Sequence, residues 1–269
     1  MAEQPLTGGN LTPGVVRVGD TVRRPAGPHS AFVAALLTLL ADRGFDGAPR
    51  YLGTDEGGRD VLSYLDGDVP ARFRTWTDAQ VHAAAALLRT FHDATRGSRL
   101  AGPHAVVCHH DPGPNNAVFR DSSARRLSVP ARRVGFPPSR AGTVPAQRPV
   151  DGLPVAFIDF DFAAPGDPLE DVGYLAWTWC VSSKPTAPEP AAQARQLSVV
   201  ADGYRLDDGQ RGGLVDAMLE RLERNARWWA GRPEEAASAR TAWSWREHAF
   251  VRAHRDRFTA ALADGAGRR

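Results

Sequence analysis

The spacing of apolar residues changes early in this chain of 269 residues. Up to about residue 65, short apolar runs alternate with turn residues, which is typical of short β-strands. From residue 77 onward the apolar positions mostly recur at helical spacing. The turn-rich segment 65-LDGDVPARF-73 separates the two patterns. The sequence therefore predicts an α+β protein with a small β-rich N-terminal part and a larger, mainly helical C-terminal part.

The N-terminal part begins with a predicted hairpin. The segments 14-GVVRVG-19 and 21-TVRRP-25 indicate two strands joined at a glycine-containing turn. A helix is expected over residues 29–45, with Ser30 capping its start and Gly44 ending it. Further strands are expected near Arg50–Gly53 and over residues 59–67.

The C-terminal part contains three strong helical patterns and two short strands. The helices are predicted over residues 77–95, 208–231 and 235–263, and the strands over 115–120 and 153–160. The two strands can form a hairpin, because they follow each other with only one segment between them.

The segment between these strands is rich in arginine, proline and serine. It carries no acidic residue between Ser122 and Val150, and residues 122–150 are predicted to form a disordered basic insertion. Such a tract could contact an anion or nucleic acid, but a solvated loop is the simpler expectation.

Composition limits the classes of partner and the compartment. The formal net charge is only +2, so no nucleic-acid partner is expected, and the longest apolar run, 31-AFVAALLTLLA-41, is too short to span a membrane. Cys108 and Cys180 form no CxxC pair and no zinc-ligand spacing, which favours two buried thiols in a reducing cytoplasm. Lys184 is the only lysine, and this arginine bias suggests a GC-rich bacterial genome.

The stretch 107-VCHHDPGPNNAVFR-120 carries the first candidate chemistry. Adjacent side chains on an extended backbone diverge, so His109 and His110 do not form a convincing metal site. The Pro-Gly-Pro sequence after Asp111 also permits a purely structural turn.

A second acidic segment gives this stretch a possible function. The apolar strand 155-VAFI-158 ends at Asp159, and Asn116 starts the preceding strand. If the two strands pair, Asn116 and Asp159 can lie side by side as oxygen ligands for Mg²⁺, with Asp111 nearby to accept a proton. Phosphoryl transfer requires this combination of a hydroxyl-orienting carboxylate and a cation that screens phosphate charge.

These two segments resemble the aminoglycoside phosphotransferase family, whose members are related to protein kinases. The stretch 109-HHDPGPNN-116 is similar to the family's catalytic loop, and 159-DFDFAAPGDPLED-171 is similar to its metal-binding segment. The resemblance implies a bilobal protein-kinase-like fold, with an N-lobe over residues 1–65 and a C-lobe over 66–269. It also implies transfer of the γ-phosphoryl group of ATP or GTP to a hydroxyl of a small molecule, with Mg²⁺ as cofactor.

The resemblance assigns roles to individual residues of the C-lobe. Asp111 would be the catalytic base, and Asn116 and Asp159 would hold magnesium. His109 would support the catalytic loop, and Asp167 and Asp171 would brace it.

The N-lobe matches the family less well. The main chains of Ser63 and Leu65 would contact adenine, as in the family's hinge. However, the strand that usually carries a phosphate-binding lysine has only arginines, and Arg24 is the first candidate for that role and Arg23 the second. The helix over residues 29–45 also lacks the usual glutamate. The missing lysine and glutamate leave a nucleotide-binding pseudoenzyme open as an alternative. A metabolite kinase of the same fold, acting on an amino alcohol or sugar, is another alternative.

Overall fold

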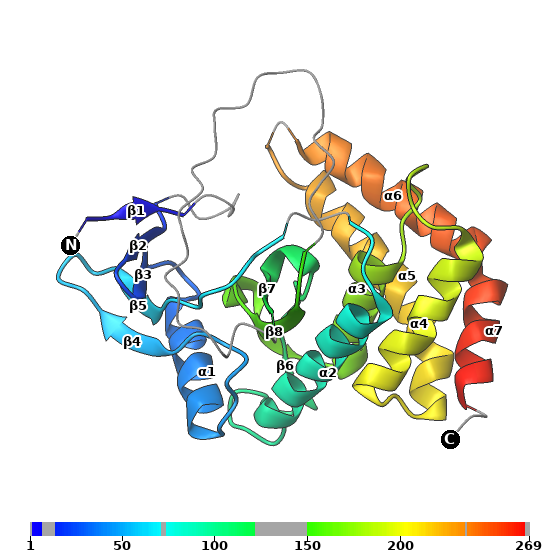
Figure 1. The fold of residues 1–269 in the computed structure, drawn as a ribbon. Coiled ribbons are helices and arrows are strands. Elements are labelled where there is room, and N and C mark those ends of the chain that lie inside the picture. The colour runs from blue at the N-terminus through cyan, green and yellow to red at the C-terminus, as the bar shows by residue number, and fades with distance from the viewer. Residues whose placement is uncertain (1, 7–13, 71–73, 122–149, 235, 267–269) are drawn as a thin grey trace.

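The computed structural model describes residues 2–6, 14–70, 74–121, 150–234 and 236–266. A small sheet and one helix lie at one end of the molecule, and six helices gather towards the other end (Figure 1). The predicted α+β class is confirmed, with the strand-rich part first in the chain. The boundary expected between residues 65 and 66 stays a prediction, and residues 122–149 of the predicted insertion lie outside the described residues.

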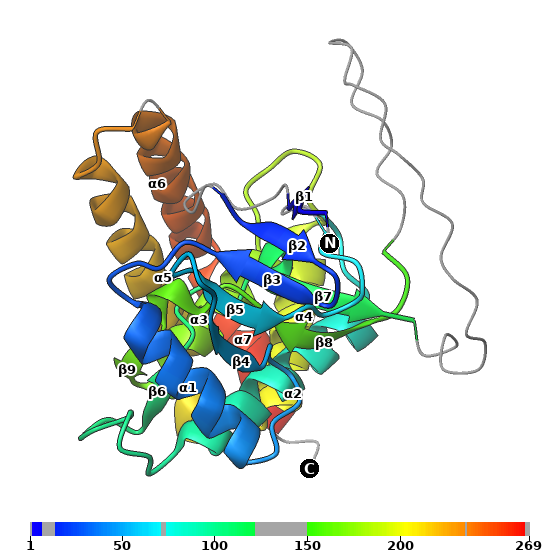
Figure 2. The same cartoon turned by 90° about the vertical axis from the view of Figure 1, so that its left-hand side faces the viewer.

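The N-terminal sheet is antiparallel throughout, in the order β1-β2-β3-β5-β4. Its strands are β1 (Gln4–Pro5), β2 (Val16–Val18), β3 (Thr21–Arg24), β4 (Tyr51–Thr54) and β5 (Asp60–Ser63). The predicted hairpin is confirmed, because Val18 pairs with Thr21 across a turn where Gly19 has a φ of 61°. Figure 2, seen from the side of the sheet, shows β3 and β5 between β2 and β4, with α1 alongside.

Helix α1 (Ser30–Asp42) connects β3 to β4 and buries its apolar side, including Leu36 and Leu37. Gly44 ends the helix as predicted, with a φ of 72° that favours glycine. The predicted cap at Ser30 is wrong, because His29 is the N-cap residue and makes no side-chain cap bond. Ser30 instead donates a hydrogen bond from its hydroxyl to the Asp60 carboxylate on β5 over 2.6 Å.

The C-terminal helices pack around one continuous apolar core. They are α2 (Asp78–Thr95), α3 (Pro168–Cys180), α4 (Pro190–Tyr204), α5 (Asp208–Ala230), α6 (Ala237–Ala253) and α7 (Arg255–Ala266). The helix predicted over residues 77–95 is confirmed, and Thr77 and Gln80 form a capping box at its start. No helix among the described residues is both long and apolar enough to cross a membrane.

The single helix predicted over residues 235–263 is wrong, because the chain breaks at His254 into α6 and α7. The apolar pattern continues across the break, which explains the prediction. Val251 before it and Phe258 after it are both fully buried. The change of direction lets α7 pack against both α4 and α5.

Two short two-stranded sheets lie between the N-terminal sheet and the helices (Figure 1). They are formed by β7 (Ala117–Arg120) with β8 (Leu153–Phe157), and by β6 (Val106–Cys108) with β9 (Ala164–Gly166). The predicted hairpin is thereby confirmed, although its strands are shorter than expected. Two turns of 3₁₀ helix adjoin these strands, η1 (Pro114–Asn116) and η3 (Phe160–Phe162).

Candidate active site

The loop that begins at His109 is held in place by a buried carboxylate from α3. Asp171 is fully buried and accepts hydrogen bonds from the backbone N–H groups of His109 over 2.6 Å and His110 over 2.7 Å. His110 has a φ of 62°, which is uncommon for a residue other than glycine. Two successive N–H groups directed at one carboxylate therefore fix the backbone in this uncommon conformation.

The pKa of Asp171 is lowered by the histidine side chains near its carboxylate. Burial alone would raise the pKa of this carboxyl, but the hydrogen bond from His92 and the nearby imidazoles of His109 and His110 lower it to about 2. The brace predicted for Asp171 is thus present in the structure. Asp167 acts differently, because its carboxylate accepts from the Leu169 N–H and caps α3.

Two side chains from the helices also bind loop carbonyls. Arg221 on α5 donates to the His110 carbonyl over 2.6 Å, and Trp179 on α3 donates to the Pro112 carbonyl over 3.0 Å. The loop is therefore tied to the helical part through both its N–H and C=O groups.

The His109 side chain supports the loop by packing and by hydrogen bonding. Its ring is fully buried and lies 4.5 Å from the Phe160 ring between centroids. Its Nε2 bonds the Ile158 carbonyl over 3.1 Å, and its Nδ1 accepts from the Asp111 N–H over 3.3 Å. Burial lowers the pKa of His109, which favours the neutral ring that this pattern of one donor and one acceptor requires.

Asn116 connects the loop to the end of β8. Its side-chain Nδ2 donates to the Asp111 carbonyl over 3.0 Å, and its own carbonyl accepts from the Ile158 N–H over 2.9 Å. Asp159 follows Ile158 directly and has a φ of 66°. The hairpin of β7 and β8 thus places Asp111, Asn116 and Asp159 in one region.

The pKa of Asp159 is raised by its burial and by the negative charge of this region. Burial raises the pKa of Asp159 to about 6, with further raising by the carboxylates of Asp161 and Asp111 and an opposing effect of Arg24. A carboxylate in such surroundings favours a nearby cation. The oxygen donors of Asp159 and Asn116 are of the type that Mg²⁺ prefers, so the residues present fit this ion.

Two residues near Asp111 were not predicted from the sequence. The Tyr174 hydroxyl on α3 donates a hydrogen bond to the Asp111 carboxylate. The Arg221 guanidinium lies over the Tyr174 ring, 4.8 Å from its centroid. Tyr174 therefore orients the carboxylate, and Arg221 supports both Tyr174 and the loop.

The two arginines of β3 have different surroundings. Arg24 contacts Asp60 on β5 over 3.3 Å and also pairs with Asp161, two residues after Asp159. Arg23 contacts Asp55 over 3.4 Å, which is consistent with the alternation of side chains along a strand. The structure thus places Arg24, and not Arg23, against the Asp159 segment.

Of the predicted hinge residues, Ser63 ends β5 and Leu65 lies in the connector that follows it. The Ser63 N–H donates to the Arg50 carbonyl over 2.9 Å, and the Ser63 hydroxyl accepts from the Arg50 N–H over 2.8 Å. The Tyr64 N–H donates to the Asp20 carbonyl over 2.8 Å. Because the N–H groups of Ser63 and Tyr64 already have partners, an adenine contact through an N–H in this segment would depend on Leu65.

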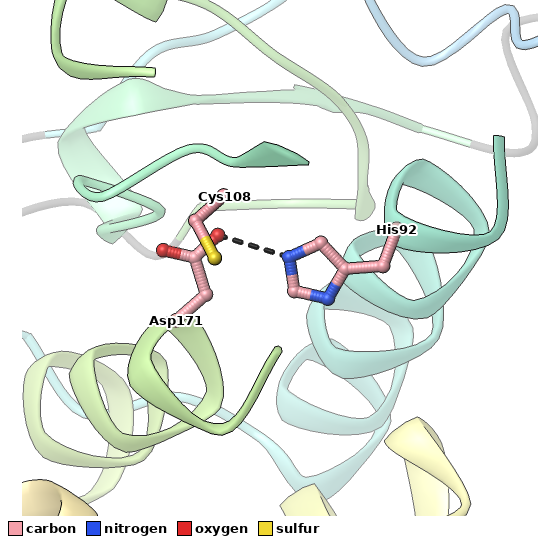
Figure 3. A group of neighbouring side chains, drawn as sticks. All are labelled: His92, Cys108 and Asp171. Atoms are coloured by element: carbon pink, nitrogen blue, oxygen red, sulfur yellow. Dashed lines mark hydrogen bonds and ion pairs between the residues drawn. The ribbon is translucent and has the colours of Figure 1, made fainter. Parts of the chain in front are cut away.

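A buried group beside the loop has metal-ligating residue types but is engaged otherwise (Figure 3). His92 bonds Asp171 through Nε2 over 3.0 Å and Tyr204 through Nδ1 over 2.7 Å, and Cys108 donates to the Asp167 carbonyl over 3.2 Å. Burial raises the pKa of the Cys108 thiol well above its usual range, which disfavours the thiolate that a metal would need. The group therefore supports the loop and is not arranged to bind a metal.

One segment of the chain matches a known protein family. Residues 150–209 match the model of the phosphotransferase enzyme family, a range that includes Asp159 and Asp171. The match contains the second of the two motifs, and the predicted resemblance to this family is confirmed.

The fold is also shared with a solved structure. The crystal structure of a choline/ethanolamine kinase family protein from Mesorhizobium loti aligns over 98% of this chain and 93% of that chain, with a TM-score of 0.58 and 16% sequence identity. This similarity confirms the predicted kinase-like fold.

One relative is similar along almost its whole sequence. The trifolitoxin immunity protein of Rhizobium leguminosarum bv. trifolii is 29% identical over 276 residues, which covers 96% of this chain and 98% of that protein.

Proposed function

We propose that this bacterial protein transfers the γ-phosphoryl group of ATP or GTP to a hydroxyl of a small molecule, in the cytoplasm and with Mg²⁺. The observation that carries the proposal is the convergence of Asp111, Asn116 and Asp159. The Asn116 side chain binds the Asp111 carbonyl over 3.0 Å, and the Asp111 carboxylate contributes to the raised pKa of Asp159.

Asp111 would orient the acceptor hydroxyl and accept its proton. Tyr174, which donates to the Asp111 carboxylate, would hold that carboxylate in position. Asn116 and Asp159 would hold magnesium, which when bound screens the charge of the phosphates. Positioning and charge neutralisation would supply most of the rate enhancement.

The N-terminal sheet would bind the nucleotide. Arg24 would contact phosphate oxygens, since a guanidinium can donate two parallel hydrogen bonds to them. Arg23 is the weaker candidate because its contact is with Asp55. The main chains of Ser63 and Leu65 would contact the base.

The test is turnover of ATP and of GTP with Mg²⁺ and a panel of amino alcohols, sugars and aminoglycosides. Asp111→Asn should lower the rate by roughly 10² to 10⁴, which is the usual contribution of general acid–base catalysis. Asp93→Asn, at an exposed ion pair on α2, is the matched control and should leave the rate unchanged. Nucleotide binding without turnover of any acceptor would instead favour the pseudoenzyme.

A second candidate function is immunity to a toxin, favoured by the similarity to the trifolitoxin immunity protein over 96% of this chain. The two functions are compatible if the toxin is the phosphoryl acceptor. Expression of the wild-type protein and of Asp111→Asn in a trifolitoxin-sensitive strain separates the possibilities. Protection by both would indicate immunity without phosphoryl transfer, and protection by the wild type alone would indicate immunity through catalysis.

A further inference from the structure

Arg24 is held between two carboxylates that differ in their surroundings. The Arg24 side chain is 11% exposed, and its partners Asp60 and Asp161 are 5% and 25% exposed. Asp60 belongs to the same sheet as Arg24, whereas Asp161 lies in η3, next to the Asp159 segment. One cation therefore joins the N-terminal sheet to the candidate metal site.

The position of Asp60 is fixed by its strand pairing and by two hydrogen bonds to its carboxylate. It lies directly opposite Arg24 in the pairing of β3 with β5. Its Oδ2 accepts from Arg24 Nε over 3.3 Å and from the Ser30 hydroxyl at the start of α1 over 2.6 Å. The Ser30 hydroxyl also accepts from the Gly27 N–H over 3.0 Å. Because the buried Asp60 carboxylate is held by a strand pairing and by a hydroxyl, it is the fixed partner of Arg24.

Asp161 is the more accessible partner. It lies in a single turn of 3₁₀ helix, and it contacts the Nη1 of Arg24. Because a phosphate group carries negative charge and accepts from a guanidinium in the same way, it can replace a carboxylate at this nitrogen without leaving Arg24 unpaired.

We propose that Asp60 is a positioning residue that holds Arg24 for the nucleotide phosphates, and that Asp161 occupies the phosphate position on Arg24 and yields it when nucleotide binds. This inference rests on the proposed function, because it assigns Arg24 to the phosphates. In this inference Asp60 takes the role of the glutamate that the family usually carries on the N-lobe helix. Helix α1 itself has no acidic residue before Asp42.

The two carboxylates should act in opposite directions on the same measured quantity. That quantity is the phosphate-dependent gain in affinity. It is the Kd of the nucleoside divided by the Kd of its magnesium-bound β,γ-imido triphosphate. Both constants are measured by calorimetry, for adenosine and for guanosine. Asp60→Asn should lower the ratio about tenfold, because Arg24 loses its fixed partner. Asp161→Asn should raise it about fivefold, because phosphate no longer competes with a partly exposed ion pair.

Arg24→Ala links both effects to the same cation. It should remove most of the phosphate-dependent gain, and in its presence Asp60→Asn and Asp161→Asn should each change the ratio less than about twofold. Asp93→Asn, which removes an aspartate from Arg89, should leave the ratio unchanged. If Asp60→Asn does not fold, Ser30→Ala removes one of the bonds to Asp60 and should lower the ratio about threefold.

Three results would contradict the inference. A ratio that falls in Asp161→Asn would show that Asp161 helps to bind the nucleotide or its metal. An unchanged ratio in Asp60→Asn, or in Ser30→Ala where it takes that variant's place, would show that Asp60 does not position Arg24. A wild-type protein that binds neither triphosphate would instead refute the proposed function itself, and the inference with it.

Discussion

Replacement of Asp171 by asparagine is the sharpest test of how the candidate catalytic loop is held. The carboxylate accepts from the backbone N–H groups of His109 and His110 and from the His92 ring, over 2.6, 2.7 and 3.0 Å. An asparagine of the same shape keeps one oxygen but presents an NH₂ group to donors. At least one buried N–H then loses its partner, and the charge-assisted part of the other bonds disappears.

The expected cost can be derived from the pKa of Asp171. The pKa of about 2, against an ordinary value of 3.8, corresponds to about 2 kcal/mol of extra stability for the ionised form in the folded state. With one unsatisfied buried donor added, Asp171→Asn should lower the free energy of unfolding by about 3 kcal/mol. Denaturant titration at pH 7 measures this change, and Asp93→Asn on α2, with a half-exposed side chain, should cost less than about 0.5 kcal/mol.

The difference between wild type and Asp171→Asn should also depend on pH. Because the folded-state pKa of Asp171 is below the unfolded value of 3.8, the stabilisation is complete above pH 4 and is lost as the pH falls from about 4 to about 2. The gap in unfolding free energy should therefore narrow as the pH is lowered from 5 to 3. A gap below about 1 kcal/mol at pH 7, or one that is the same at pH 3 and pH 6, would refute this account of the brace.

Three further predictions concern other groups of the site. Mg²⁺ affinity should fall as the pH drops below about 6, where Asp159 gains a proton, and Asp159→Asn should remove this dependence in a calorimetric titration. Tyr174→Phe should lower the turnover rate about tenfold with little change in the Kd for nucleotide, because only the orientation of Asp111 is lost; an equal loss of nucleotide affinity would contradict this role. Cys108 and Cys180 should not react with a thiol reagent in the native protein and should react on denaturation, since both are buried and burial raises the pKa of both thiols.

The parts of the site that could be predicted from the sequence lie close together along the chain. Asp111 and Asn116 share one loop, and Asp159 follows an apolar strand whose pairing with β7 is a simple hairpin. Such features leave a local pattern of apolar residues, turn residues and spacing. The α+β class could be predicted for the same reason, since the change from strand to helix periodicity is visible along the chain. The kinase-like fold was implied only by the resemblance of the two motifs to a known family.

The missed residues act across long sequence separations. Tyr174 reaches Asp111 from 63 residues away, Arg221 reaches the His110 carbonyl from 111 residues away, and Asp60 reaches Arg24 from 36 residues away. A single tyrosine, arginine or aspartate in a helix or strand gives no periodic signal of its partner. The break at His254 was missed because buried residues continue at helical spacing on both sides of it.

The missing helix glutamate has a physical explanation in the N-terminal part. Helix α1 buries Val33, Leu36, Leu37 and Leu40 in the core, and its only acidic residue is its last, Asp42. The carboxylate that pairs with the β3 cation comes instead from the neighbouring strand, through Asp60, and α1 contributes only the Ser30 hydroxyl. An ion pair built within one sheet needs no carboxylate from α1. The absence of the usual lysine and glutamate is therefore not evidence for a pseudoenzyme, because Arg24 contacts Asp161 near the candidate metal site and a buried carboxylate, Asp60, contacts Arg24. Turnover by the wild type and by Asp111→Asn distinguishes the two possibilities, since a pseudoenzyme would show the same rate in both.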